Sequence, residues 1–136
     1  MLCDANGVPL GLAIDGANVH DINLFIDTLF NVPIDWPDPT PDALQNLCLD
    51  KGYDAAWVRD QIRAWGLVPH VPRRGEDPSP RPPGPGHVAH RWVVERLHAW
   101  MNDFRRIQIR WEKKAANYKA MLHLAFSAIL HRMSRE

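Results

Sequence analysis

The sequence predicts a protein of the α/β class, in which short strands alternate with amphipathic helices. Two observations carry this prediction. The pair Asn6-Gly7 is a strong signal for a tight hairpin turn. The apolar run Leu47-Cys48-Leu49 lies between a proline-rich connection and a helical pattern, which is typical of a buried strand in a parallel sheet.

The first thirty residues predict a hairpin followed by a helix. Residues 1–3 are apolar, and apolar side chains alternate along residues 8–14, so we expect two strands joined at Asn6-Gly7. A strand this short has little to pair with, so we expect a larger fold whose N-terminal strand is missing from this chain. Helical spacing of apolar residues predicts a helix over residues 19–30, capped by Asn18 or by His20-Asp21.

The middle of the chain predicts a strand, a helix and a second strand. Prolines between positions 33 and 41 favour an extended connection to the run Leu47–Leu49, which ends at Asp50. Residues 54–65 have apolar side chains on one helical face, Gly66 ends the helix, and Leu67-Val68 begins another strand.

Two more helices are predicted after a loop rich in proline, glycine and charge at residues 73–86. The first has Val93, Leu97, Trp100 and Phe104 on one face. Its other side holds a polar set at the same spacing: Arg91, Glu95, His98 and Asn102. The last helix is expected from about Ala115 to Met133.

Charge and cysteine content narrow the class of protein. The 136 residues include sixteen basic and sixteen acidic side chains, and the acidic ones dominate the first half while basic pairs follow in the second. A basic half is a weak indication of phosphate contact, and a solvated helix face explains it equally well. Two cysteines, no apolar run long enough for a membrane span and no leader pattern predict a soluble, cytoplasmic protein.

Two carboxylates stand where chemistry is plausible, although each has a simpler explanation. Asp50 follows a buried strand just before a helix, the position where α/β folds place ligand-binding groups. An aspartate there is more often a helix-start signal. Glu95 lies on a helix beside Arg91 and Arg96, where a surface ion pair is the more common arrangement.

Several sequence blocks, in order, change this balance, because together they resemble the DDE transposases of insertion sequences and cover nearly the whole chain. The resemblance is closest to the group with a tyrosine-arginine-glutamate-lysine signature. The blocks are Gly7-Val8-Pro9-Leu10-Gly11, Gly16-Ala17-Asn18-Val19-His20-Asp21, Asp50-Lys51-Gly52-Tyr53-Asp54, Arg91-Trp92-Val93-Val94-Glu95-Arg96, Ala99-Trp100-Met101-Asn102 and Phe104-Arg105-Arg106.

This resemblance implies an RNase H-like catalytic domain, a mixed sheet flanked by helices, of which residues 1–136 are a part. It also implies DNA transposition by cleavage and strand transfer, with Asp50 and Glu95 as catalytic ligands of Mg²⁺ or Mn²⁺. The DNA-binding residues implied or suggested by position are Arg91, Arg96, Lys51, Arg105 and Arg106. The partners implied are the DNA of element ends and target, and a second transposase copy or a complementing upstream polypeptide.

The departures from the signature limit the expected activity. Val88 and Asn102 stand where related transposases often have tyrosine and lysine or arginine. The family's first aspartate belongs to a strand before the hairpin, and neither Asp4 nor Asp15 is expected to replace it. Because two carboxylates bind magnesium weakly, we expect the chain to be catalytically silent alone.

Other interpretations stay open or are disfavoured. The chain could instead be a non-catalytic DNA-binding or regulatory fragment, or a decayed remnant. The histidines near Glu95 are a poor zinc site because no cysteine is nearby. The six tryptophans are more often core residues than bases' stacking partners.

Overall fold

The chain begins with a hairpin whose turn is organised by the side chain of Asp4. In the computed structural model, Oδ1 of Asp4 accepts hydrogen bonds from the backbone N–H groups of Asn6 at 2.9 Å and Val8 at 2.8 Å. Gly7 has a φ of 88°, a left-handed conformation that glycine adopts without steric cost. The predicted turn at Asn6-Gly7 is therefore confirmed, and Asp4 has a structural role in it.

The hairpin strands are short and antiparallel. Strand β1 (Leu2–Cys3) pairs with β2 (Pro9–Gly11), with an irregular register within β1. Strand β2 was expected to continue to Ile14, but β1 offers no residue with which the later positions could pair. Beyond β2 the chain turns toward the next helix, and a Cβ atom at Gly11 would lie only 2.5 Å from the carbonyl oxygen of Thr28.

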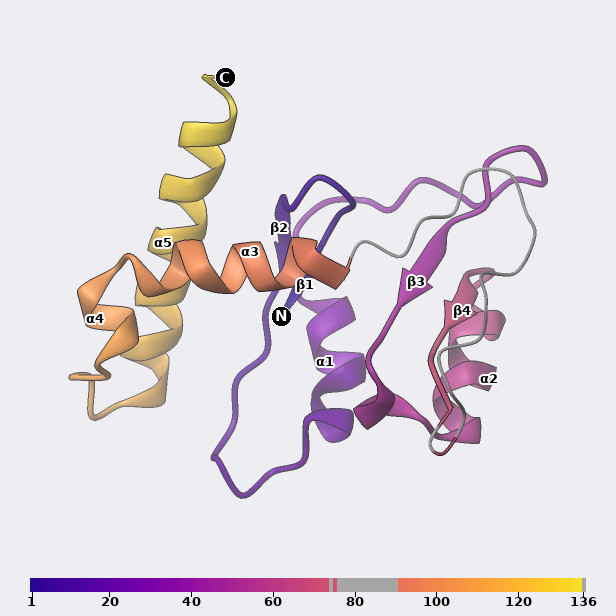
Figure 1. Cartoon of the computed structure of the whole chain (residues 1–136), viewed down its shortest axis with the longest axis horizontal. Helices are drawn as coiled ribbons and strands as arrows, with labels where there is room; N and C mark the ends of the chain where they lie inside the picture. Colours follow the sequence, from indigo (N-terminus) through magenta and orange to yellow (C-terminus); the bar gives the residue numbers. More distant parts are fainter. Residues whose placement is uncertain (74, 76–90, 136) are drawn as a thin grey trace. The chain divides into compact units, whose positions relative to one another are not determined.

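The structure describes residues 1–73, 75 and 91–135, with only the backbone at position 91 (Figure 1). These residues belong to two units, Met1–Ile34 with His90–Glu136, and Asp35–Ala89. The predicted loop 73–86 lies outside the described residues except for Arg73 and Gly75.

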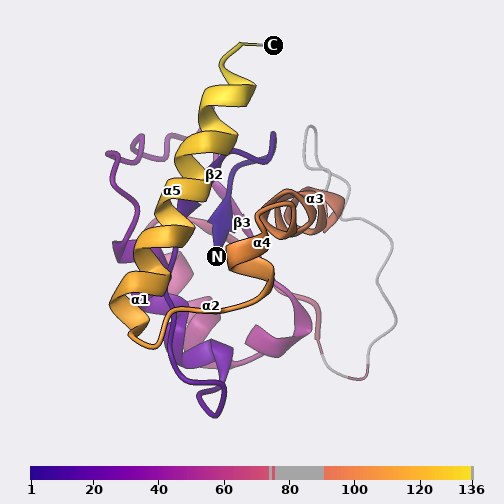
Figure 2. The same cartoon turned by 90° about the vertical axis from the view of Figure 1, so that its left-hand side faces the viewer.

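The first unit packs helices around the hairpin. Helix α3 (Arg91–Asn102) passes across β1, and α5 (Ala115–Met133) crosses α3 (Figures 1 and 2). The short helix α4 (Arg105–Gln108) lies between them along the chain and contacts both. The first unit also contains η1 (Asp21–Leu24) and α1 (Phe25–Phe30).

The core of this unit joins α3 to α5. Leu97 of α3 has no exposed surface, and Phe126 and Ile129 of α5 are 6% and 3% exposed. Burying such side chains provides most of the stabilisation available to helices of this length. The whole buried cluster is Leu12, Leu97, Met101, Ile107, Leu122, Ala125, Phe126 and Ile129.

The second unit is a small parallel strand pair with one helix. Strand β3 (Asn46–Cys48) pairs in parallel with β4 (Val68–His70), as the apolar run Leu47–Leu49 predicted, but Leu47 is the one buried residue of β3. Helix α2 (Ala56–Ala64) connects them after the single turn η2 (Lys51–Tyr53). Val58 and Ile62 of α2 are fully buried, which confirms the predicted apolar face.

Three expectations about elements need adjustment. Helix α5 has the predicted bounds, but the helix expected from residue 19 begins as η1, with His20 accepting from the N–H of Ile22. Phe104 was expected on the same helix as Val93, yet it has an extended backbone and starts α4. Across the described residues the strands form two separate two-stranded sheets, one antiparallel and one parallel.

Candidate active site

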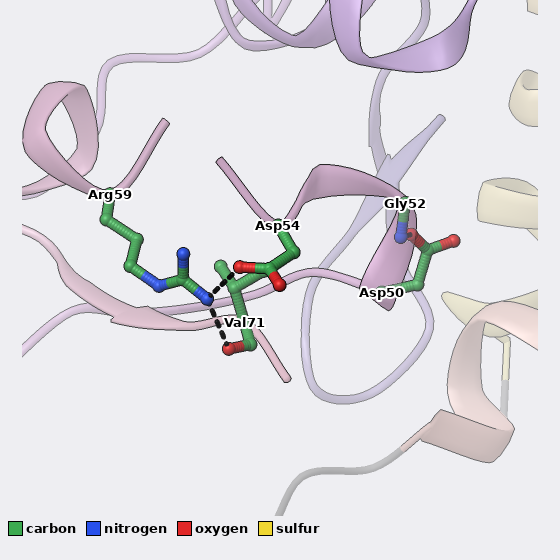
Figure 3. A network of polar contacts seen from close by, with 5 residues as sticks. All are labelled: Asp50, Gly52, Asp54, Arg59 and Val71. Carbon is green, nitrogen blue, oxygen red and sulfur yellow. Dashed lines mark hydrogen bonds and ion pairs between the residues drawn. The ribbon is translucent and has the colours of Figure 1, made fainter. Parts of the chain in front are cut away.

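Asp50 is held at the end of strand β3 with its carboxylate in solvent. Its backbone is extended, and its Oδ1 accepts a 2.7 Å hydrogen bond from the N–H of Gly52, so it caps the turn η2 (Figure 3). Both predicted properties are therefore present: the residue is a cap, and it lies where a parallel strand ends. The cap fixes the direction of the carboxylate while the side chain stays exposed.

Asp54, in the same five-residue block, has a different role. Its Oδ1 lies 2.6 Å from Nη2 of Arg59, and the two side chains are only 16% and 18% exposed. The same nitrogen of Arg59 donates to the carbonyl oxygen of Val71 at 3.1 Å (Figure 3). Arg59 therefore ties α2 to the segment after β4 and also holds Asp54, which leaves Asp50 as the exposed carboxylate of the block.

Glu95 lies on the exposed side of helix α3. The buried residues Val93 and Leu97 flank it in sequence and face the core of the first unit. Within the described residues Glu95 has no hydrogen bond or ion pair, so the expected surface ion pair is absent there. The side chain of Arg91, the predicted neighbour of Glu95, lies outside the described residues.

The carboxylates fit a hard divalent cation in chemistry but not in number. Carboxylate oxygens are ligands that Mg²⁺ prefers, and near-octahedral coordination requires several of them. Asp50 belongs to the second unit and Glu95 to the first. No group of three or more histidine, cysteine, aspartate or glutamate side chains suited to a metal occurs in the described part of the chain. Asp50 and Glu95 are the two candidate ligands within the residues that the structure describes.

Arg96, predicted to bind DNA, is engaged inside its own unit. Its Cζ lies 4.6 Å from the ring centroid of Trp92 and 4.7 Å from that of Trp100, so the guanidinium lies between two indoles. Its Nη2 donates to the carbonyl oxygen of Asn6 in the hairpin turn. Nε of Arg96 is buried and has no partner within the described residues. Arg96 therefore fastens α3 to the hairpin.

Three other predicted DNA-binding residues, Lys51, Arg105 and Arg106, are exposed. Lys51 follows Asp50 in η2, and Arg105 opens α4. Arg106 is 66% exposed and forms a 3.2 Å ion pair with Glu112, whose side chain is only 8% exposed. Glu112 was not predicted as a site residue, because nothing in the basic sequence around it indicates that its side chain is buried. The contacts of Arg96 with Trp92 and Trp100 could have been predicted, because residues four positions apart on a helix are neighbours.

The fold and the candidate site define an α/β protein with one exposed carboxylate after a parallel strand and another on a long helix. Residues 1–130 match the family described as the transposase DDE domain, so the chain belongs to the DDE transposase family of insertion sequences. It is 34% identical, over 129 residues, to a Burkholderia cepacia protein assigned as the transposase for insertion sequence element IS402.

The match to the IS402 protein covers most of this chain but only part of the relative. It covers 91% of the chain and 57% of the IS402 protein, so the chain spans somewhat more than half the length of this relative. No solved structure matches the chain. No helix in the described residues is long and apolar enough to cross a membrane.

Proposed function

We propose that this chain contributes two of the three catalytic carboxylates of a transposase that cleaves and joins DNA by metal-dependent phosphoryl transfer. Asp50 and Glu95 are the proposed ligands of Mg²⁺ or Mn²⁺. The observation that carries the proposal is the position of Asp50, exposed and oriented at the end of the parallel strand β3, within a family defined by such carboxylates.

The two residues are held differently. Asp50 has one oxygen fixed by the N–H of Gly52, so its other oxygen can approach a ligand without a large loss of side-chain freedom. Glu95 is positioned by its helix, which is anchored by the buried Leu97 and by the contacts of Arg96. When bound, the metal ions would activate water or a DNA 3′ hydroxyl and stabilise the leaving oxygen.

We further propose an RNase H-like fold for the complete catalytic domain, with residues 1–136 as one part of it. An antiparallel pair β1–β2 and a parallel pair β3–β4 are the two kinds of pairing that a mixed sheet contains, which supports this proposal. The first aspartate would come from a preceding strand supplied by a longer polypeptide or by a complementing one. The proposed partners are element ends, target DNA and a second transposase copy.

The test compares the chain alone with a fusion that supplies the missing carboxylate. The fusion partner is the part of the IS402 relative that the chain does not match. Plasmid nicking and strand transfer are measured with magnesium or manganese. We expect activity from the fusion only, since two carboxylates bind magnesium weakly. Cleavage by the chain alone that requires Asp50 would contradict the proposed division.

A non-catalytic DNA-binding role is the second candidate, favoured by the exposed cations around Arg105 and Arg106. It predicts salt-dependent DNA binding by the chain that is unchanged by Glu95→Ala. Binding without activity in any fusion would support this second role.

A further inference from the structure

Ten consecutive residues at the junction of α4 and α5 combine many exposed cations with one hidden anion. Residues 105–114, here called the basic segment, contain five basic side chains and a single acidic one, Glu112. The acidic side chain is 8% exposed. The segment therefore shows solvent only positive formal charge, carried by Arg105, Arg106, Arg110, Lys113 and Lys114.

Glu112 gathers two of these arginines around itself. Its Oε1 lies 3.2 Å from Nη2 of Arg106, and its backbone carbonyl accepts a 3.1 Å hydrogen bond from Nε of Arg110. The guanidinium of Arg110 also lies 5.1 Å from the ring centroid of Tyr118 on α5. Two long side chains that would otherwise sample many rotamers are thus restrained, which reduces the entropy lost when they bind a ligand.

The cost of this arrangement suggests that it serves something besides stability. Oε2 of Glu112 is buried and has no hydrogen-bond partner within the described residues. Leaving such an atom unpaired costs about 1–3 kcal/mol. The ion pair with the exposed Arg106 adds little to the stability of the fold, because solvent screens it. An orienting effect of the Glu112 carboxylate on the Arg106 guanidinium would explain this costly position.

The start of helix α5 adds to the positive character of the segment. Lys114 precedes the helix with an extended backbone and gives no side-chain cap, and no acidic residue occupies the first turn. The unpaired N–H groups there carry partial positive charge. Trp111, in the same segment, is 65% exposed and presents a flat apolar ring beside the cations.

We propose that the basic segment binds the phosphate backbone of double-stranded DNA, and that Glu112 is a positioning residue that orients Arg106 toward a phosphate. Guanidinium groups pair with phosphate oxygens through two parallel hydrogen bonds, so the orientation of the fork decides the strength of the contact. The choice of DNA as the partner rests on the proposed function. The pairing of guanidinium with phosphate follows from the residues of the segment themselves.

Glu112→Leu gives a test in which two explanations predict opposite signs. If only charge matters, removing a negative charge strengthens DNA binding. If Glu112 orients Arg106, the same change weakens binding by about fivefold, because the restraint on the guanidinium is lost. We expect the weaker binding, measured by fluorescence anisotropy of the full chain with a labelled duplex. Tighter or unchanged binding overturns the positioning role.

A double-mutant comparison shows whether Glu112 acts through Arg106. Arg106→Ala is expected to weaken binding roughly tenfold, as for a lost charge-assisted hydrogen bond. It should also reduce the slope of log affinity against log salt by about 0.9, one phosphate contact. In the Arg106→Ala background, Glu112→Leu should no longer weaken binding. Additive effects of the two changes would contradict the proposal.

A matched control removes one arginine charge at an exposed position outside the basic segment. Arg63 pairs with Asp60 at 3.1 Å in an exposed ion pair on α2, outside the basic segment. Arg63→Ala removes the same charge and should alter duplex affinity less than twofold, a small nonspecific effect. An equal loss from both arginines would overturn the assignment of the surface. A thermal melt of Glu112→Leu checks that the variant stays folded, which we expect because the substitution removes the unpaired buried oxygen.

The outcome is separable from that of the proposed function. Loss of nicking by the fusion with retained duplex binding would refute the catalytic proposal alone. No duplex binding by the chain, or stronger binding to vesicles of anionic lipid than to DNA, would refute the surface alone.

Discussion

The guanidinium of Arg96 lies 4.7 Å from the ring centroid of Trp100, one helical turn further along α3. Trp92, one turn before, covers the other side at 4.6 Å, and the arginine still reaches the carbonyl of Asn6. The helix that bears Glu95 is thereby attached to a hairpin at the other end of the sequence. Arg96 therefore has a structural role in the first unit, and its predicted contact with DNA stays a prediction.

Replacing Arg96 should destabilise the first unit. Arg96→Ala removes a charge-assisted hydrogen bond and two cation–π contacts, so we expect the free energy of unfolding to fall by about 2 kcal/mol. Arg96→Lys should recover only part of this loss, because an ammonium lacks the planar fork. Urea denaturation measures both. The exposed Arg63→Ala is the control, and an equal loss there would remove Arg96 from the framework.

Gly7→Ala should cost more than the same change at Gly75. Both glycines have positive φ, 88° and 83°, so both substitutions meet a backbone penalty of about 1 kcal/mol. A Cβ atom at Gly7 would also lie 2.8 Å from Nη2 of Arg96, whereas at Gly75 nothing lies within 4 Å. The extra loss should shrink in an Arg96→Ala background. Equal melting temperatures for the two variants would argue against the close approach.

The two ion pairs of the second unit should differ in strength. Asp54→Asn breaks the largely buried pair with Arg59 and should lower the free energy of unfolding by about 2 kcal/mol. Asp60→Asn breaks a pair whose side chains are 72% and 59% exposed, so the loss should stay below about 0.5 kcal/mol. Chemical denaturation of both variants provides the comparison, and similar midpoints would contradict it.

His98 should make stability depend on pH in a defined direction. Partial burial, and then the positive Met1 amino group, lower the pKa of His98 from its reference value of 6.5. The unfolded chain therefore binds this proton more readily than the folded one, so the contribution is complete above pH 6.5 and is lost as pH falls below it. Between pH 7.5 and 5.5 the wild-type urea midpoint should fall further than that of His98→Gln. Equal falls of the two urea midpoints would show that His98 does not contribute to the pH dependence of stability.

Elements with a long apolar period were predictable, and contacts across the chain were not. Helix α5 had the expected bounds because residues such as Leu122 and Ile129 repeat along one face. The parallel pairing of β3 was predicted from the apolar run Leu47–Leu49, although Cys48 is exposed. The end of α3 before Phe104 was not predicted, because the helical spacing of apolar residues continues to Phe104 although the helix itself has ended.

The surroundings of the candidate site could not be predicted from the sequence. Asp50 and Glu95 were identified from the order of sequence blocks, and their catalytic role stays a prediction. The sequence could not show that Asp54 is held by Arg59, or that Glu112 is buried among cations. The partner of Arg96, the carbonyl of Asn6, is ninety positions away and carries no sequence signal of its own.

The central claim is that Asp50 and Glu95 are catalytic ligands, and nicking by the fusion in magnesium tests it most directly. Asp50→Asn and Glu95→Gln each keep the size of the side chain and remove the charge that would hold a metal ion, while Asp60→Asn makes the same change at an exposed position of α2. We predict that either of the first two abolishes nicking and that the third does not. Nicking that persists in Asp50→Asn or Glu95→Gln would contradict the claim.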